Sequence, residues 1–245
     1  MKIITDLSTT SAPHRARHGW KPDWLFRSGA QGAWYDPSDL TTLYQDVSGT
    51  LPVTADGDPV ALMLDKSGND NHATQPIVAA RPTWRSDGNL CWLEHDGVDD
   101  QMFIPIIPYS TPLSMSVFIG LHRFAGGGWS TFRSAAVLAP EFATAGASNP
   151  TDPGLLTNTA GGNTRVDGQV FTGGRIALHA ALQVPRVGGA LNNTTAAFLR
   201  EGTFFAMANL RPPGRVFAYV ECENVPANKV ALIEHWVAGK TGVAL

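Results

Sequence analysis

The sequence is poor in charged residues and has no long apolar run. Charged residues make up 16% of the chain, against about a quarter in most globular proteins. The net charge of −3 provides no electrostatic attraction to nucleic acid or to an anionic membrane surface. No run approaches the roughly 18 apolar residues that a membrane-spanning helix needs. We therefore expect neither a nucleic acid nor a membrane as a partner.

Cysteine is also scarce. Cys91 and Cys222 are too few for a disulfide framework, and both lie in apolar, strand-like sequence, so we expect two buried free thiols. The first ten residues lack the apolar core of a secretory signal. These features predict synthesis in the cytoplasm and folding under reducing conditions.

The spacings that mark well-known catalytic and metal sites are missing. The seven histidines form no zinc-binding pattern, and no Gly-x-Ser-x-Gly nucleophile elbow occurs. Glycine-rich runs such as residues 126–128 lack the Lys-Ser/Thr of a phosphate-binding loop. We expect a protein that is not an enzyme and that needs no organic cofactor.

The chain does contain many short strand patterns separated by turn signals. The clearest is at residues 113–124, where apolar side chains alternate, so that Met115, Val117 and Ile119 share one face. Further strands are predicted at 33–36, 60–64, 90–95, 101–107, 165–171, 175–184, 196–200, 203–210 and 216–223, with loops and one or two strands in 125–162. One helix is predicted at 229–238, with Pro226 in its first turn and Gly239 after its end. This pattern predicts one all-β sandwich domain over residues 32–245.

Residues 1–31 differ from the rest and are predicted to form an irregular N-terminal arm. The arm carries three large aromatic residues, Trp20, Trp24 and Phe26, which need a surface to cover them. They could lie across the sandwich of their own chain, or they could anchor the arm to another subunit. We keep both interpretations.

Three short polar segments carry most of the remaining information. They are residues 34–39 (Trp-Tyr-Asp-Pro-Ser-Asp), 65–74 (Asp-Lys-Ser-Gly-Asn-Asp-Asn-His-Ala-Thr) and 93–100 (Leu-Glu-His-Asp-Gly-Val-Asp-Asp). Together they resemble the front half of the laminin-G-like, concanavalin-A-like lectin-fold domains of tailed-bacteriophage structural proteins. The resemblance covers residues 32–110 well and residues 220–245 loosely. It implies a jelly-roll β-sandwich that belongs to a virion.

The second segment has the oxygen ligands that a Ca²⁺ ion prefers. Asp65, Asn69 and Asn71 are the candidate metal ligands, although the spacing is not that of an EF-hand. The same residue types also build turns, because Asp and Asn bond to their own backbone and Gly68 supplies a positive φ. In the resembled family this segment mainly recurs as a structural loop.

The third segment reads as a turn. Asp96-Gly97 is a hairpin signal, and the resemblance assigns residues 96–100 to a structural turn. His95 stands where the family more often has an aromatic residue. We expect the carboxylates of this segment to serve the turn.

Two carboxylates at the end of the last predicted strand raise a different possibility. Glu221 and Glu223 share a face in an extended strand, and we expect Phe217 and Tyr219 on that face as well. Paired carboxylates beside aromatic rings are what a glycosidase needs. The segment departs from the strand motif of a glucanase family with this fold, because Pro226 occupies the place of its last acid.

The leading hypothesis is a non-enzymatic virion structural protein, either a head decoration or spike or a tail-fibre component. It would be made in the host cytoplasm, form a homo-oligomer and contact other capsid or tail proteins. The alternative is a carbohydrate-binding module for host-surface glycans, with Trp129, Tyr219 and Glu221 as the candidate binding residues. A glycoside hydrolase is the remote third hypothesis.

Overall fold

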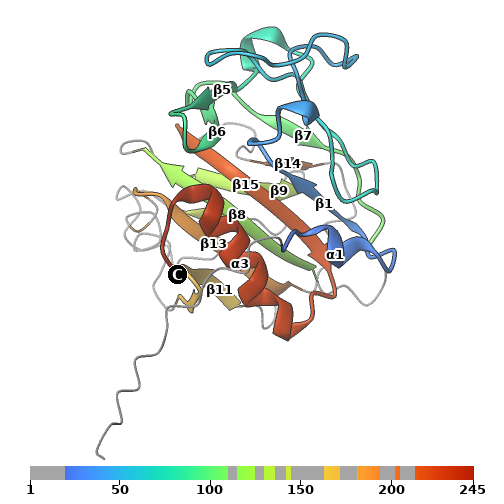
Figure 1. Cartoon of the computed structure of the whole chain (residues 1–245), viewed down its shortest axis with the longest axis vertical. Helices are drawn as coiled ribbons and strands as arrows, with labels where there is room; N and C mark the ends of the chain where they lie inside the picture. The colour runs from blue at the N-terminus through green and yellow to red at the C-terminus, as the bar shows by residue number, and fades with distance from the viewer. Residues whose placement is uncertain are drawn as a thin grey trace, which may run out of the picture.

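Two antiparallel β-sheets are the main elements of the described residues, and a helix follows the last strand (Figure 1). The computed structural model describes residues 20–109, 115–124, 130–135, 142–144, 163–171, 181, 183–193, 202–204 and 213–245. The prediction of an all-β fold with a C-terminal helix is confirmed in these ranges.

The larger sheet has eight strands within the described residues. They are β1 (Gly32–Tyr35), β5 (Thr83–Ser86), β6 (Cys91–His95), β8 (Met115–Arg123), β11 (Asn163–Val166), β12 (Gln169–Val170), β13 (Arg186–Asn193) and β15 (Gly214–Glu223). Their order is β12-β11-β13-β8-β15-β6-β5, and β1 pairs with β15 beside this path.

The smaller sheet has seven strands within the same ranges. They are β2 (Leu43–Tyr44), β3 (Leu62–Met63), β4 (Ala73–Thr74), β7 (Met102–Ile104), β9 (Ser130–Ala135), β10 (Phe142–Thr144) and β14 (Gly202–Phe204). Their order is β10-β9-β14-β7-β4-β3-β2.

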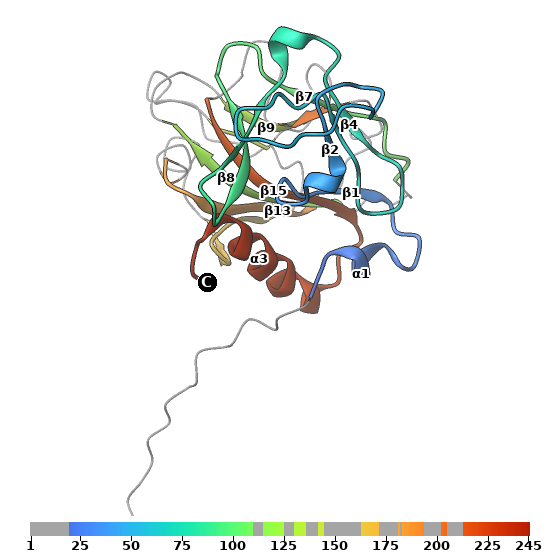
Figure 2. The same ribbon diagram turned by 45° about the horizontal axis from the view of Figure 1, so that its top comes forward.

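A third layer covers the outer face of the larger sheet. It consists of helix α3 (Ala227–Thr241) and the short helix α1 (Asp23–Phe26). Figure 2 shows both helices on one side of β8, β13 and β15, and the smaller sheet on the other side. Two 3₁₀ turns, η1 (Leu40–Thr42) and η2 (Val78–Ala80), lie in the connections.

Two hydrophobic cores separate these three layers. The first lies between the sheets and includes Met115, Val117 and Ile119 of β8, so the predicted alternation of this strand is confirmed. The second lies between the larger sheet and the helices and includes Phe118 of β8 and Ile233 of α3. Alternate side chains of one strand therefore enter opposite cores, as the pleat of a strand requires.

A β-bulge changes the alternation within β15. The pairing with β8 shifts between Val216 and Ala218. Val216 and Tyr219 both enter the core between the sheets. The Phe217 side chain, on the other face, packs 5.8 Å from the ring of Trp92 and beside Gly120 under α3. The prediction that Phe217 shares a face with Tyr219 is wrong, because the extra residue of a bulge reverses the side-chain parity.

Two further strand predictions differ from the structure at segments that contain glycine beside Asp or Asn. Residues 165–171 form a hairpin of β11 and β12, because Asp167 and Gly168 both adopt positive φ in its turn. Strand β13 was missed because its Gly188, Gly189 and Asn residues read as loop. Of the strand predicted at 175–184, residues 183 and 184 form a turn and a bend, and most of the rest lies outside the described residues.

Helix α3 is longer than predicted. It begins at Ala227, after Pro226, and continues through Gly239 to Thr241. The left-handed residue that ends it is Gly242, with φ 71°. No helix in the described ranges is both long and apolar enough to cross a membrane. Both cysteines are free, Cys222 buried and Cys91 half-buried.

The close approach of α3 to β8 yields a stability prediction. A Cβ atom at Gly120 would lie 2.6 Å from Thr241 Cγ2 and 3.1 Å from Val237 Cγ1. We expect Gly120→Ala to lower the free energy of unfolding by about 1–3 kcal/mol, the usual cost of overpacking, as measured by thermal or urea unfolding.

Gly239→Ala is the matched control for Gly120→Ala. Gly239 lies in α3 with no atom within 4 Å of an added Cβ, so alanine should stabilise the helix by up to about 1 kcal/mol. Equal effects of the two substitutions would contradict the close packing of α3 on β8.

Candidate functional site

The first polar segment joins the start of the sandwich to its end. Asp36, which follows β1, is buried, and its Oδ1 accepts hydrogen bonds from the Ser38 amide and hydroxyl at 3.1 and 2.7 Å. Its Oδ2 lies 2.9 Å from the Lys240 ammonium of α3 and 3.5 Å from Lys66. Asp36 thus holds two cations from distant parts of the chain.

The same cations also contact aromatic rings. Lys66 lies 4.8 Å from the ring centre of Trp34, and Lys240 lies 5.2 Å from that of Trp236. The two indoles meet edge to face at 5.7 Å. Lys66 is also 2.5 Å from Asp39, so the segment is built from compensated charges. We assign it a structural purpose, the attachment of α3 to β1.

The second segment, the loop 65–72, covers the free edge of β1. Asp65 Oδ1 accepts hydrogen bonds from the amides of Trp34 and Ser67 at 2.8 and 2.9 Å. Its Oδ2 accepts from the Ser67 hydroxyl at 2.6 Å and from the Asn71 amide at 3.0 Å. All four bonds lie within the protein, so this carboxylate replaces the neighbouring strand that β1 lacks on that side.

The amide side chains of the loop complete this contact. Asn69 and Asn71 both donate their Nδ2 to the carbonyl of Gly32, at 3.2 and 2.7 Å. The Tyr35 hydroxyl donates in turn to the Asn71 carbonyl. The three predicted calcium ligands are therefore brought together, and each binds the backbone of β1, Asp65 through Oδ1 and the two asparagines through Nδ2. This geometry favours the turn interpretation over the calcium interpretation.

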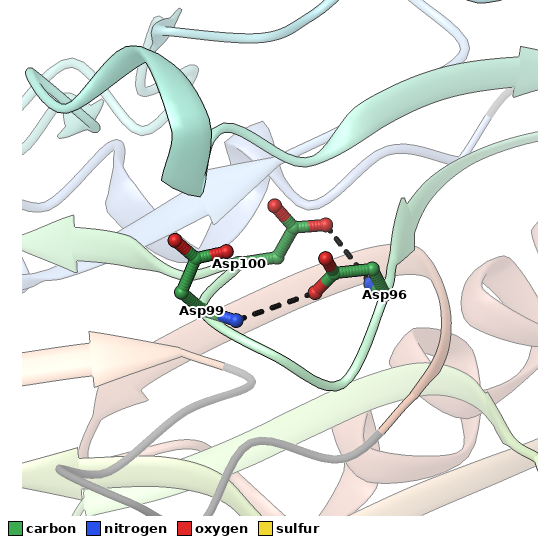
Figure 3. Close-up of side chains that lie close together, drawn as sticks. All are labelled: Asp96, Asp99 and Asp100. Atoms are coloured by element: carbon green, nitrogen blue, oxygen red, sulfur yellow. Dashed lines mark hydrogen bonds between the residues drawn. The ribbon is translucent and has the colours of Figure 1, made fainter.

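The third segment places three carboxylates together, as Figure 3 shows. The ligand oxygens of Asp96, Asp99 and Asp100 lie within 4.8 Å of one another. Asp100 Oδ2 accepts from the Asp96 amide at 2.9 Å, and Asp96 Oδ1 accepts from the Asp99 amide at 3.4 Å. These bonds are those of a tight turn around Gly97, which has φ 81°.

Burial shifts the protonation of two residues in this turn. Burial and the negative charges of Asp96 and Asp99 together raise the pKa of Asp100 to about 7, against the opposing effect of the hydrogen bond from the Asp96 amide. Burial also lowers the pKa of His95 to about 3. His95 is therefore neutral at pH 7 and occupies the place of an aromatic residue as an uncharged core side chain.

Of the glycosidase and glycan residues on β15, Tyr219 and Glu221 face the interior. Glu221 has no exposed surface, and its two oxygens accept hydrogen bonds from the hydroxyls of Tyr109 and Tyr219. Glu223 is 7% exposed and accepts from the Gln31 amide at 2.9 Å. Glu221 and Tyr219 meet as predicted, but between the sheets, where no glycan reaches them in this conformation. Trp129 lies outside the described residues.

The described part of the arm packs on its own chain. Leu25 and Phe26 are buried in the core beneath α3, and Trp20 is partly buried against it. For residues 20–31 this arrangement agrees with the interpretation in which the arm lies across the sandwich of its own chain. Trp24 alone of the three aromatic side chains is exposed, at 41%. The anchoring role of Trp20, Trp24 and Phe26 stays a prediction.

Trp24 lines a cleft that the sequence did not reveal. The cleft has a volume of about 570 Å³ and lies between the arm and the junction of β15 with α3. Its walls come from segments almost 200 residues apart, which no local motif connects. The one sequence signal for this cleft was Trp24, a large aromatic residue in a segment without strand or helix periodicity.

Comparisons with protein-family models, with curated proteins and with solved structures found no match for this chain.

The loop that covers β1 gives a test of the turn interpretation. Asp65→Asn replaces one acceptor oxygen by a donor, which would face the Asn71 or Ser67 amide. We expect a loss of about 2–3 kcal/mol of folding free energy, the scale of hydrogen bonds to a charged group. The melting temperature should fall equally in excess Ca²⁺ and in EDTA.

Asp70→Asn is the control for Asp65→Asn, because Asp70 is an exposed residue of the same loop with φ 58° that asparagine also tolerates. It should leave the melting temperature unchanged. A wild-type melting temperature that rises with Ca²⁺, and ceases to do so in Asp65→Asn, would establish the cation site instead.

The raised pKa of Asp100 predicts a pH dependence of stability. Below its ordinary value of 3.8 the carboxyl is protonated in both states. Between 3.8 and about 7 only the unfolded state ionises, so stability falls as the pH rises through 7. Asp100→Asn keeps an acceptor for the Asp96 amide and should gain about 1–3 kcal/mol over wild type at pH 8, since one pKa unit is about 1.36 kcal/mol. It should gain none at pH 4.

The control for Asp100→Asn is Asp87→Asn in a nearby turn. Hydrogen bonds from the amides of Leu90 and Asn89 lower the pKa of Asp87, so this substitution should not stabilise the protein at pH 8. Thermal unfolding at the two pH values measures both variants. A gain for Asp100→Asn that is the same at pH 4 and pH 8 would exclude its ionisation as the cause.

Proposed function

We propose that the protein is a non-enzymatic structural component of a tailed-bacteriophage particle, as a head decoration or spike or as part of a tail fibre. Its body would be a concanavalin-A-like, laminin-G-like jelly-roll sandwich. The resemblance of the three polar segments carries the link to phage. Two antiparallel sheets followed by a C-terminal helix agree with that resemblance at the level of fold class.

The use of the polar side chains supports a structural role. Asp36, Asp65 and Asp100 each direct an oxygen to a backbone amide or to a neighbouring cation of the same chain. Glu221 is enclosed by two tyrosine hydroxyls. Groups that are already satisfied inside the fold are poor candidates for acid–base work, which requires access to a substrate proton. These residues hold a rigid sandwich together.

The proposal includes attachment through the arm, to capsid or tail proteins and to other copies of the chain. Residues 20–31 contribute Leu25 and Phe26 to the core under α3. A truncation that leaves this core whole therefore ends before Trp20. In this proposal residues 1–19 make the contact, and repetition on a symmetric particle adds avidity to each weak contact.

The presence of the protein in particles is the direct test. Phage particles purified from a host whose phage genome encodes this chain should contain it in stoichiometric amounts, as measured by quantitative mass spectrometry. Its absence from particles, together with its presence in the soluble lysate, would overturn the proposal.

Deletion of residues 2–19 tests the attachment. The truncated protein should unfold at the same temperature as the full chain, because none of the described core residues is removed. It should be missing from particles. Normal incorporation of the truncated protein would move the attachment surface to residues 20–31, which keep Trp20 and Trp24, or to the sandwich itself.

A further inference from the structure

We propose that the cleft beside the arm binds an uncharged sugar ring, a binding activity that goes beyond the structural role and does not depend on it. The cleft of about 570 Å³ falls within the size range of small-molecule sites. Its walls are formed by residues 24, 25 and 27–30 of the arm and by residues 222–224 and 226 at the junction of β15 and α3.

Trp24 provides an aromatic platform in this cleft. Its side chain is 41% exposed, although it belongs to a helix whose next two residues are buried. The Lys229 ammonium lies 4.1 Å from the centre of the indole ring, which limits the freedom of the ring, and Lys229 is not one of the residues lining the cleft. A pyranose presents C–H groups on one face, and these carry the partial positive charge that the face of an indole attracts.

Polar groups also line this cleft. The Glu223 carboxylate is 7% exposed, and the Gln31 amide, 2.9 Å from its Oε1, fixes its orientation. Asn224 is exposed and holds a positive φ of 50°, and Ser28 adds a hydroxyl on the arm side. A carboxylate, an amide and a hydroxyl are the acceptors and donors that sugar hydroxyl groups require.

The charges of the cleft favour an uncharged ligand. The Arg27 guanidinium lies 2.7 Å from Asp23, so its charge is compensated. Burial raises the pKa of the Cys222 thiol to about 12, so the thiol is neutral. The Glu223 carboxylate and the Arg27 guanidinium, which both line the cleft, carry opposite charges. Neither an anion nor a cation would find a field of one sign here.

The test uses the full-length chain and defined probes. Saturation-transfer NMR is recorded with methyl glycosides of glucose, galactose, mannose, N-acetylglucosamine and rhamnose, one at a time. We expect at least one of them to receive saturation from the protein. Trp24→Ala should weaken its binding by about tenfold or more, because the aromatic anchor of a site carries much of the affinity.

A second variant distinguishes a loss of sugar binding from a loss of the fold. Asn224→Gly removes the amide side chain, and glycine adopts the positive φ without strain, so the fold should persist while binding weakens. Ile77→Ala is the control, because Ile77 is an exposed apolar residue, at 57%, that does not line the cleft. It should bind the sugar like the wild type.

Three results would overturn the proposal. The first is that none of the five glycosides receives saturation, and the second is that binding survives both Trp24→Ala and Asn224→Gly. The third is a full-length oligomer, seen by light scattering, that Trp24→Ala dissociates, because Trp24 would then be a subunit contact. None of these results bears on the presence of the protein in particles, so the two proposals fail separately.

Discussion

The hydrogen bonds that Asp65 and Asn71 make to β1 set the position of much else in the molecule. Strand β1 has β15 on one side and the loop 65–72 on the other, which adds bonds from the Lys66 amide and from Asn69. Once β1 is held, Tyr35 lies 5.7 Å from its pairing partner Tyr219 in the core between the sheets. Asp36 then comes within reach of Lys240 in α3. A polar loop therefore fixes both the inner core and the helical layer.

Strand β15 is the element that the two cores share. It pairs with β1, β6 and β8, and its side chains enter the inner core and the outer core in turn. The bulge at Phe217 places this side chain against Trp92 and beside Gly120, while Tyr219 stays in the inner core. This arrangement explains how one strand supports a three-layer structure, and why its Glu221 ends in the interior.

Alternation of apolar residues was enough to predict β8, and helical spacing after Pro226 was enough to predict α3, although the helix begins at Ala227 and not at residue 229. The sequence predicted less well wherever backbone geometry outweighed side-chain character. Gly188 and Gly189 lie in a strand because their neighbours β8 and β11 pair with it, which no local pattern reveals. The polar segments were recognised as turns, but their contacts with β1 and α3 are tertiary. The cleft depends on Trp24 and Glu223 meeting across the fold, so no motif could indicate it.

The ion pair between Asp36 and Lys240 joins residues 204 positions apart, and β1 pairs with a strand near the end of the chain. During translation β1 therefore emerges long before its partner exists, since synthesis proceeds from the N-terminus at about 5–20 residues per second. The larger sheet can close only after β15 and α3 have left the ribosome. Until then the loop 65–72 can cover one edge of β1, and the other edge, which pairs with β15 in the folded protein, has no partner strand.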